Sequence, residues 1–376
     1  MSDFGRSLRQ LRQAAGLSQP QLARRVPVDQ STLSRWENGR STPDRDTVQQ
    51  LDDLLDAAGR LSRSASPTMP GVVPPTFDVA EPVTTDHIEE LQNSITQLVA
   101  LDRQHGGVEL APMAARLFRS AANRLASGKC SQAIEHDLAA VTAELGEVAG
   151  WLAFDAMQYD NARNLNLEAL HLSRLAGDRN MELFLLGNMA MQAQETRRPR
   201  EALRTVQLME TFNLSPRLRV MTGMRHARAA ADLGDHRAFA VMHRAQSDLS
   251  SSVQSTDPDW AWWVNDHELK AHEGGMWRAV GEPSRAVDCY NAVLDRTAPR
   301  FRWARFIGAA NLVNALVEVA SWAEAEQAAA EVHALANHVS SARAARRIHT
   351  AATSARRNGA PSTLQDLLTV LAPHAT

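Results

Sequence analysis

The chain has 376 residues and very little cysteine or lysine. Cys130 and Cys289 are its only cysteines, too few for a disulfide framework and typical of a reducing compartment, so we expect a cytoplasmic location. Lys129 and Lys270 are its only lysines, and its basic side chains are therefore nearly all arginine. Abundant arginine and alanine favour helices, and this bias is also typical of high-GC bacterial genomes.

The sequence also lacks a run long and apolar enough to suggest a transmembrane helix. Its most apolar stretch, residues 306–323, contains Asn311, Asn314 and Glu318, whose polar groups are costly in lipid. We expect a buried helix there and no membrane partner. The residues from Ser2 to Arg6 contain no apolar core, so we expect no signal peptide.

A recognisable catalytic or metal-binding set is missing as well. His267 and His272 are five residues apart and would lie about 140° apart on a helix, whereas a zinc-protease helix needs histidines at i and i+4. Residues 128–130 lack the upstream glycine and the hydroxyl residue of a phosphate-binding loop. We therefore expect a protein that is not an enzyme and uses no cofactor and no metal.

What the sequence does contain is a series of short helical patterns within residues 1–61. Phe4, Leu8 and Leu11 share one helical face, and arginines occupy the other faces. Ser18 and Gln21 have the spacing of a capping box, which predicts the start of a second helix.

A third helix is predicted from Asp29, a suitable N-cap, to Gly39, which ends it. Leu33 and Trp36 are three residues apart and should face inward, while the polar side chains stay outside. A fourth apolar stripe follows at residues 48–55. This arrangement is suited to placing the third helix in the major groove of duplex DNA.

Charge supports the same interpretation. Residues 1–45 contain eight arginines and four acidic residues, in a chain whose total net charge is −3. A locally basic face on an acidic protein is expected of a protein that binds a polyanion such as duplex DNA. A protein-binding module with surface arginines stays as the alternative.

Residues 1–62 resemble the lambda-repressor-like helix-turn-helix domain of the xenobiotic response element family. The motifs that carry the likeness are Leu17-Ser18-Gln19-x-x-Leu22-Ala23, Ser31-x-Leu33-Ser34-x-x-Glu37-x-Gly39 and Pro43. The chain departs from the family pattern at Val26-Pro27-Val28, where a glycine is more usual.

This resemblance implies two sets of DNA contacts. The side chains expected to meet base edges are Gln30, Ser31 and Ser34. The side chains expected to meet phosphates are Gln19, Arg35, Asn38 and Arg40.

Beyond this region the composition changes twice. Residues 63–86 contain five prolines among small and polar residues, which predicts an extended, semi-stiff linker. Residues 87–376 show successive helix-length periodicities without alternating strand patterns. We therefore predict an all-α protein with a helix-turn-helix domain at 1–62, a proline-rich linker at 63–86 and a helical repeat domain at 87–376.

The repeat domain carries a degenerate repeat of small residues. The triplets at offsets 0, +4 and +7 are Ala162, Asn166 and Ala169; Ala202, Val206 and Met209; Ala238, Met242 and Ala245; Ala286, Tyr290 and Val293; and Ala325, Ala329 and Val332. Their spacing is near that of tetratricopeptide helix pairs, and the region resembles a divergent tetratricopeptide solenoid. The complete order of segments resembles large bacterial regulators that sense a peptide or small molecule. Residues 101–107 and 149–156 resemble the actinobacterial type.

Solenoids of this kind have a concave surface, formed mainly by the first helix of each pair, on which ligands lie. The polar residues predicted on that surface are Asn188, Gln192, Arg225, Arg228, Asp266, Lys270, Asn311 and Asn314. Asparagine side chains donate and accept hydrogen bonds simultaneously, which suits an extended peptide. Solvation or the capping of turns is the alternative role for these side chains.

Four tryptophans lie within residues 260–277, and of these Trp263 and Trp277 are predicted to wall a ligand pocket. Packing in the protein core is the alternative for both.

A two-heptad apolar stripe, Ile88, Leu91, Ile95 and Leu98, follows the linker directly. It suits either pairing with a second subunit or capping of the solenoid. We expect a homodimeric transcription regulator that binds an inverted-repeat DNA operator and whose repeat domain receives the signal. A protein-interaction scaffold with a degenerate DNA-binding head is the alternative function.

Overall fold

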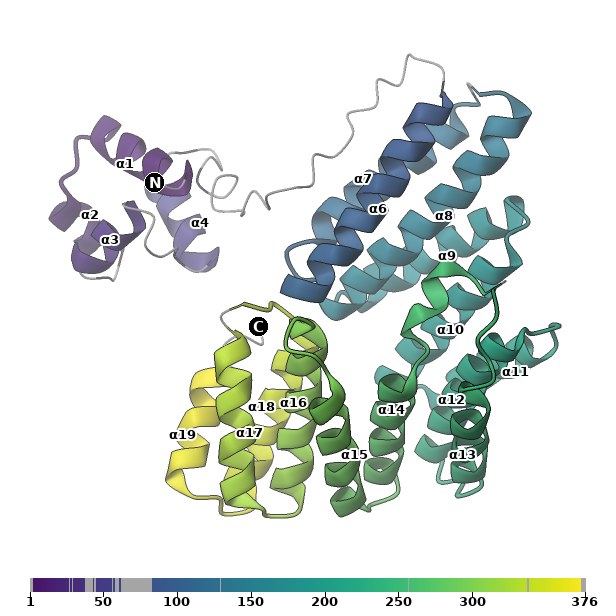
Figure 1. Ribbon diagram of the computed structural model, residues 1–376. Coiled ribbons are helices and arrows are strands. Elements are labelled where there is room, and N and C mark those ends of the chain that lie inside the picture. Colours follow the sequence, from purple (N-terminus) through teal and green to yellow (C-terminus); the bar gives the residue numbers. More distant parts are fainter. Residues whose placement is uncertain are drawn as a thin grey trace. The chain divides into compact units, whose positions relative to one another are not determined.

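The computed structural model describes residues 3–26, 28, 30–37, 43, 45–55, 57, 61, 83–128, 130–255, 257–336 and 338–372. All the regular secondary structure of these residues is helical, which confirms the predicted all-α fold class. The chain divides into two compact units, residues 1–72, called the head, and residues 73–376, called the body (Figure 1). Each unit is described separately.

The head is built from short helices around one apolar core. Its helices are α1 (Asp3–Ala14), α2 (Gln19–Arg25), α3 (Gln30–Glu37) and α4 (Arg45–Leu54). The predicted capping box is present, because the Gln21 amide donates to the Ser18 hydroxyl at 3.4 Å and the Ser18 amide donates to the Gln21 side chain at 2.8 Å. Leu33 is fully buried and Trp36 is 5% exposed, as the inward-facing pattern predicts.

The body is a succession of antiparallel helices (Figure 1). Its helices are α6 (Thr85–His105), α7 (Ala111–Ala126), α8 (Gln132–Asp155), α9 (Tyr159–Leu175), α10 (Arg179–Glu195), α11 (Pro199–Glu210), α12 (Pro216–Asp232), α13 (Ala238–Leu249), the 3-10 helix η1 (Asp259–Trp263), α14 (Asp266–Ala279), α15 (Pro283–Arg296), α16 (Arg302–Glu318), α17 (Trp322–Ala336), α18 (Ala342–Arg357) and α19 (Ser362–Leu371).

Small residues lie where the second helix of each pair crosses its neighbour. The leading residues of the predicted triplets, Ala162, Ala202, Ala238, Ala286 and Ala325, lie on α9, α11, α13, α15 and α17 and are at most 1% exposed. Side chains of this size let paired helices approach closely, which gives the observed stack of helix pairs.

A tight turn with a left-handed residue joins the helices of a pair. This residue is Met157 after α8, Arg197 after α10, Gly281 after α14 and Ala320 after α16, with φ between 56° and 82°. In each turn the following amide donates to a carbonyl five residues earlier, at 2.8 Å from Glu282 to Trp277 and 3.0 Å from Ser321 to Leu316. These bonds have the pattern of the Schellman motif, which satisfies carbonyls at a helix end.

The two ends of the body meet. Helix α6 packs on α8 and on α16. The Ser340 amide donates to the His105 carbonyl at 2.6 Å, and the Val108 amide donates to the Ser340 carbonyl at 3.3 Å. Gly106 has φ +79° there, and a Cβ on it would lie 2.4 Å from the Ser340 oxygen, so this junction requires glycine.

The apolar stripe of α6 is buried within the body. Ile88, Leu91, Ile95 and Leu98 are each at most 7% exposed within the single chain. Of the two roles predicted from sequence, the structure therefore favours packing on the end of the helical array over pairing with a second subunit.

Candidate DNA-binding surface and ligand cavity

Helix α3 carries the residues predicted to read bases. Gln30 is exposed and Ser34 is half-buried. Ser31 and Arg35 also lie on α3, but their side chains are outside the described part of the chain, as are the whole residues Asn38 and Arg40. A polar side chain exposed at the start of a recognition helix has the position from which base edges are contacted in helix-turn-helix proteins.

A buried carboxylate fixes the end of α3 to α1 and α2. Glu37 is fully buried, and Arg12 donates to it through Nε at 2.5 Å and through Nη2 at 3.0 Å. Arg12 Nη1 also donates to the Leu17 carbonyl at 2.8 Å. Burial raises the pKa of Glu37, but the hydrogen bonds from Arg12 and Gln19 outweigh burial and lower it. This network sets the orientation of α3 within the head.

Gln19, predicted from the resemblance to meet a phosphate, belongs to the same network. Its Nε2 donates to Glu37 Oε2 at 2.8 Å, and the residue is half-buried. The contact places Gln19 at the junction of α2 and α3. Its DNA contact stays a prediction.

The body forms a large cavity of about 1500 Å³ that is partly open to solvent. Six of the ten residues predicted to bind a ligand line it, namely Asn188, Arg225, Arg228, Trp263, Asn311 and Asn314. A volume of this size exceeds the roughly 300–1,000 Å³ of most small-molecule pockets and has room for a short peptide or a sizeable organic molecule.

The other four predicted residues, Gln192, Asp266, Lys270 and Trp277, lie outside the cavity lining. Asp266 pairs with Arg296, and Lys270 donates to Glu273 at 2.9 Å. Trp277 stacks on Phe239 with ring centroids 3.9 Å apart, which is the core-packing alternative for this tryptophan. Gln192 is 7% exposed on α10.

Two of the asparagines that line the cavity also hold the protein together. Asn188 Nδ2 donates to Glu147 Oε1 at 2.7 Å. Asn314 Nδ2 donates to the carbonyls of Ala310 at 2.9 Å and Arg347 at 2.7 Å, so it connects α16 to α18. Their side chains are therefore already engaged, in part, with neighbouring helices.

An aromatic wall borders the cavity at η1. Phe184 of α10 stacks on Trp260 with centroids 4.1 Å apart and an interplanar angle of 9°. Trp263 lies 5.8 Å from the same phenyl ring, and the Arg225 guanidinium lies 5.2 Å from the Trp263 ring centroid. The residues of this inserted segment thus form a flat apolar surface beside a cation.

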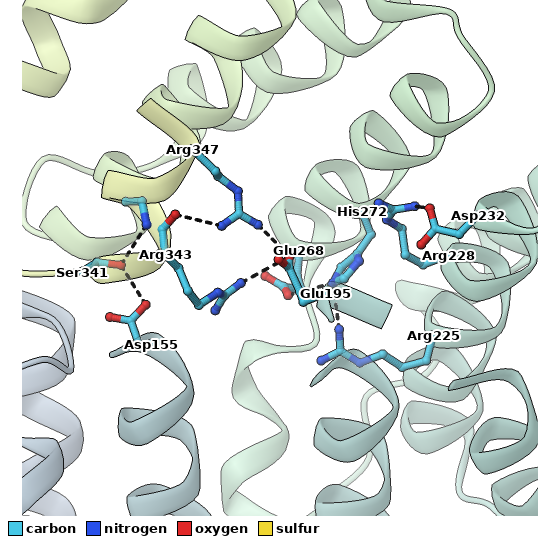
Figure 2. A network of polar contacts seen from close by, with 11 residues as sticks. Asp155, Glu195, Arg225, Arg228, Asp232, Glu268, His272, Ser341, Arg343 and Arg347 are labelled. Atoms are coloured by element: carbon cyan, nitrogen blue, oxygen red, sulfur yellow. Dashed lines mark hydrogen bonds and ion pairs between the residues drawn. The ribbon is translucent and has the colours of Figure 1, made fainter. Parts of the chain in front are cut away.

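Charged side chains from several helices meet across the cavity (Figure 2). Arg347 Nη2 donates to Glu195 Oε1 at 2.6 Å, and Arg343 Nη2 lies 3.7 Å from the same oxygen. Burial alone would raise the pKa of Glu195, but the cations Arg347, Arg343 and Arg228 lower it to about 2. Glu195 is therefore a stable anion between α10 and α18.

Asp155, at the end of α8, joins the two ends of the body. Its Oδ2 accepts from the Gly107 amide and from Trp303 Nε1, both at 3.1 Å, and its Oδ1 accepts from Ser341 Oγ at 2.8 Å. Asp155 is fully buried, so these donors replace the water that a carboxylate needs.

Two other acids on the cavity wall have raised pKa values. Burial raises the pKa of Glu147 to about 8, despite the hydrogen bond from Asn188. Burial and the nearby Asp155 raise the pKa of Asp102 to about 7. Both groups hold a proton more readily than ordinary carboxyls, so near neutral pH they offset less of the positive charge around them than ordinary carboxylates would.

The sequence interpretation missed most of these charged residues. Asp102 and Asp155 lie within the two motifs that resemble actinobacterial regulators. The motifs themselves did not indicate that these two acids would line or border a cavity. Arg343 and Arg347 are spaced i, i+4 on α18, the first helix of the last pair, and this spacing on an inner face was the available signal.

Comparison with known proteins identifies the kind of domain that the head forms. Residues 3–64 match the family model of a helix-turn-helix domain. Comparison with curated proteins gives no match. Among solved structures the chain is similar to Bacillus thuringiensis PlcR, crystallised in complex with the peptide PapR7 and DNA, at 15% identity and a TM-score of 0.37, over 78% of this chain and 93% of that chain. This N-terminal part is thus a helix-turn-helix domain, and a structural likeness of that level identifies no ligand.

Among the helices described, none is both long and apolar enough to cross a membrane. Nor do three or more His, Cys, Asp or Glu side chains gather in the described regions as a metal-binding group.

Proposed function

We propose that this protein is a sequence-specific, DNA-binding transcription regulator. The observation that carries the proposal is the helix-turn-helix domain, with Gln30 exposed at the start of α3 and the end of α3 anchored by buried Glu37. In this reading α3 enters the major groove, Gln30, Ser31 and Ser34 contact base edges, and Gln19, Arg35, Asn38 and Arg40 contact phosphates. Helix α2, which carries Gln19, then crosses the DNA backbone.

We further propose that the body receives a peptide or small-molecule signal in its cavity. Asn188, Arg225, Trp263 and Asn311 would contact that ligand. A ligand changes DNA binding only if it binds one arrangement of the protein better than another. In a homodimer, such a preference would alter how the two heads are placed on an inverted-repeat operator.

Selection from a pool of random-sequence duplexes tests the DNA-binding proposal. The full-length protein should enrich an inverted repeat whose half-site centres lie one or more helical turns apart, roughly 34 Å per turn. Its mass in solution should be that of a dimer. No enrichment above the starting pool would contradict the proposal and support the scaffold with a degenerate head.

A pair of variants separates base reading from phosphate binding. Gln30→Ala should relax sequence preference, whereas Arg40→Ala should weaken binding to all duplexes alike and flatten the salt dependence by about one unit of slope. Gln50→Ala, at an exposed position of α4, is the matched control and should change neither. An unchanged salt slope for Arg40→Ala would contradict the phosphate contact.

A further inference from the structure

Two buried guanidinium groups on the cavity wall have hydrogen-bond donors without acceptors. Arg225 of α12 is 4% exposed and Arg343 of α18 is 7% exposed, and both line the cavity. Arg225 Nε has no hydrogen-bond partner, and neither do Nε and Nη1 of Arg343. A buried guanidinium normally has its N–H groups satisfied, so these donors are available to acceptor atoms of a ligand.

The charges of these guanidinium groups are also incompletely balanced within the protein. Arg343 shares its nearest carboxylate, Glu195, with Arg347, which is closer to it. Arg225 Nη1 lies 2.8 Å from His272 Nε2. His272 Nε2 also lies 3.2 Å from Glu268 Oε1, and burial and the nearby Arg225 lower the pKa of His272, so this ring supplies no negative charge to Arg225. Glu268 stabilises the Arg225 cation in part.

Two acids on the cavity wall, Asp102 and Glu147, supply less negative charge than ordinary carboxylates would. Burial raises the pKa of Glu147 to about 8 and that of Asp102 to about 7, so near neutral pH Glu147 is mostly protonated and Asp102 is partly protonated. A protonated carboxyl donates a hydrogen bond to an anion and does not repel it.

A flat apolar surface lies beside the cations. Trp263 lies under the Arg225 guanidinium, and the stacked pair of Phe184 and Trp260 continues the surface. The indole Nε1 of Trp263 is a further donor without a partner. Aromatic rings of this kind stack on planar or aliphatic parts of a ligand.

We propose that the cavity binds an organic acid, with its carboxylate on Arg225 and Arg343 and its apolar part against Trp263, Phe184 and Trp260. Arginine N–H groups match the geometry of a carboxylate and bind it by paired hydrogen bonds. Carboxylate is favoured over phosphate because Glu195, an anion on the same wall, repels a doubly charged group more strongly. This assignment rests on the proposed role of the body as the signal-binding part of the regulator.

Calorimetric titration of the full-length protein without DNA tests the assignment. The probes are indole-3-acetate, 4-phenylbutyrate and decanoate, each paired with its neutral amide, together with phenyl phosphate. At least one acid should bind, and its amide should bind at least about tenfold more weakly, because hydrogen bonds to a charged group are lost. Binding of no acid, equal binding of acid and amide, or preference for phenyl phosphate would each overturn the proposal.

Variants place the carboxylate. Arg343→Gln and Arg225→Gln should each weaken binding of the acid at least about tenfold and leave binding of the amide nearly unchanged. Arg343→Lys, which keeps the charge but not the paired donors, should also bind the acid more weakly. Arg356→Gln is the matched control on the exposed face of α18 and should bind as the wild type does. Wild-type affinity in both glutamine variants would refute the assignment.

Failure of the carboxylate site can be distinguished from failure of the proposed signalling role of the body. If the acid binds as described but leaves DNA binding unchanged in a gel shift, the signalling role fails and the carboxylate site stands. If DNA binding responds to a neutral peptide that needs neither arginine, the signalling role stands and the carboxylate site fails.

Discussion

Asp155 provides the most direct test of how the two ends of the body are held together. Its carboxylate accepts hydrogen bonds from the Gly107 amide, Trp303 Nε1 and Ser341 Oγ, which come from three distant parts of the body. Asp155→Ala removes the two oxygens that accept these three hydrogen bonds and leaves the donors without partners in a buried site. The variant should therefore weaken the junction and destabilise the body.

The magnitude follows from these contacts. A hydrogen bond to a charged acceptor contributes about 1.5–3 kcal/mol, and three of them give a loss of roughly 4–9 kcal/mol before the chain relaxes. Relaxation and entry of water reduce the loss, so we expect at least about 3 kcal/mol. Asp155→Asn keeps one oxygen and the shape of the side chain, and it should lose less.

Tryptophan emission during urea unfolding of the full-length protein measures this loss. Trp36 is the only tryptophan of the head, and the other seven lie in the body, so the signal reports mainly on the body. Asp288→Ala, at an exposed position of α15, is the control and should change the free energy of unfolding by less than about 0.5 kcal/mol. A loss below about 1 kcal/mol in Asp155→Ala would refute the reasoning.

Three further predictions concern the head, the turns and a buried acid. Glu37→Ala leaves the Arg12 cation buried without its anion, so it should lower the free energy of unfolding of the head by about 3–5 kcal/mol. The loss should appear as weaker protection of the α3 amides from hydrogen exchange, and protection equal to wild type would contradict the anchoring role. Ala320 has a positive φ that is strained for a residue with a Cβ, so Ala320→Gly should stabilise the body by about 1 kcal/mol. Gly281→Ala introduces the same strain in the equivalent turn and should destabilise the body by a similar amount. Urea unfolding measures both changes. The folded-state pKa of Glu147 is about 8, above its ordinary value, so its protonated form stabilises the body at low pH and this contribution is lost as pH rises toward 8. Glu147→Gln should remove that loss, so the variant should be more stable than wild type by on the order of a few kcal/mol at pH 8.5 and equally stable at pH 4. A stability difference that does not change with pH would contradict the raised pKa.

The sequence was sufficient for local structure and for the faces of individual helices. Capping at Ser18, the inward positions of Leu33 and Trp36 and the small residues at Ala162 and its equivalents depend on neighbours within one or two turns of helix. Such short-range spacing is directly legible in a single sequence.

The closure of the body and the charged network were not legible in this way. Asp155 and Ser341 are 186 positions apart, and Arg347 and Glu195 are 152 apart, so their meeting depends on the summed rotation of every helix pair between them. Small rotations per repeat accumulate along a solenoid and have no local sequence signal. For the same reason the sequence placed Asp266 and Lys270 on the ligand surface, while in the structure they pair with Arg296 and Glu273 and do not themselves line the cavity.

The central claim is that α3 reads DNA sequence, and the binding of full-length wild type and Gln30→Ala to the selected duplex tests it most directly. Affinity is measured for that duplex and for variants with one substituted base pair in the half-site, at a fixed salt concentration. The account predicts that wild type loses about 1–3 kcal/mol at a contacted base pair and that Gln30→Ala loses this discrimination at one position of the half-site. Equal discrimination by both proteins at every position would contradict base reading by Gln30, and no discrimination by wild type would contradict sequence-specific binding itself.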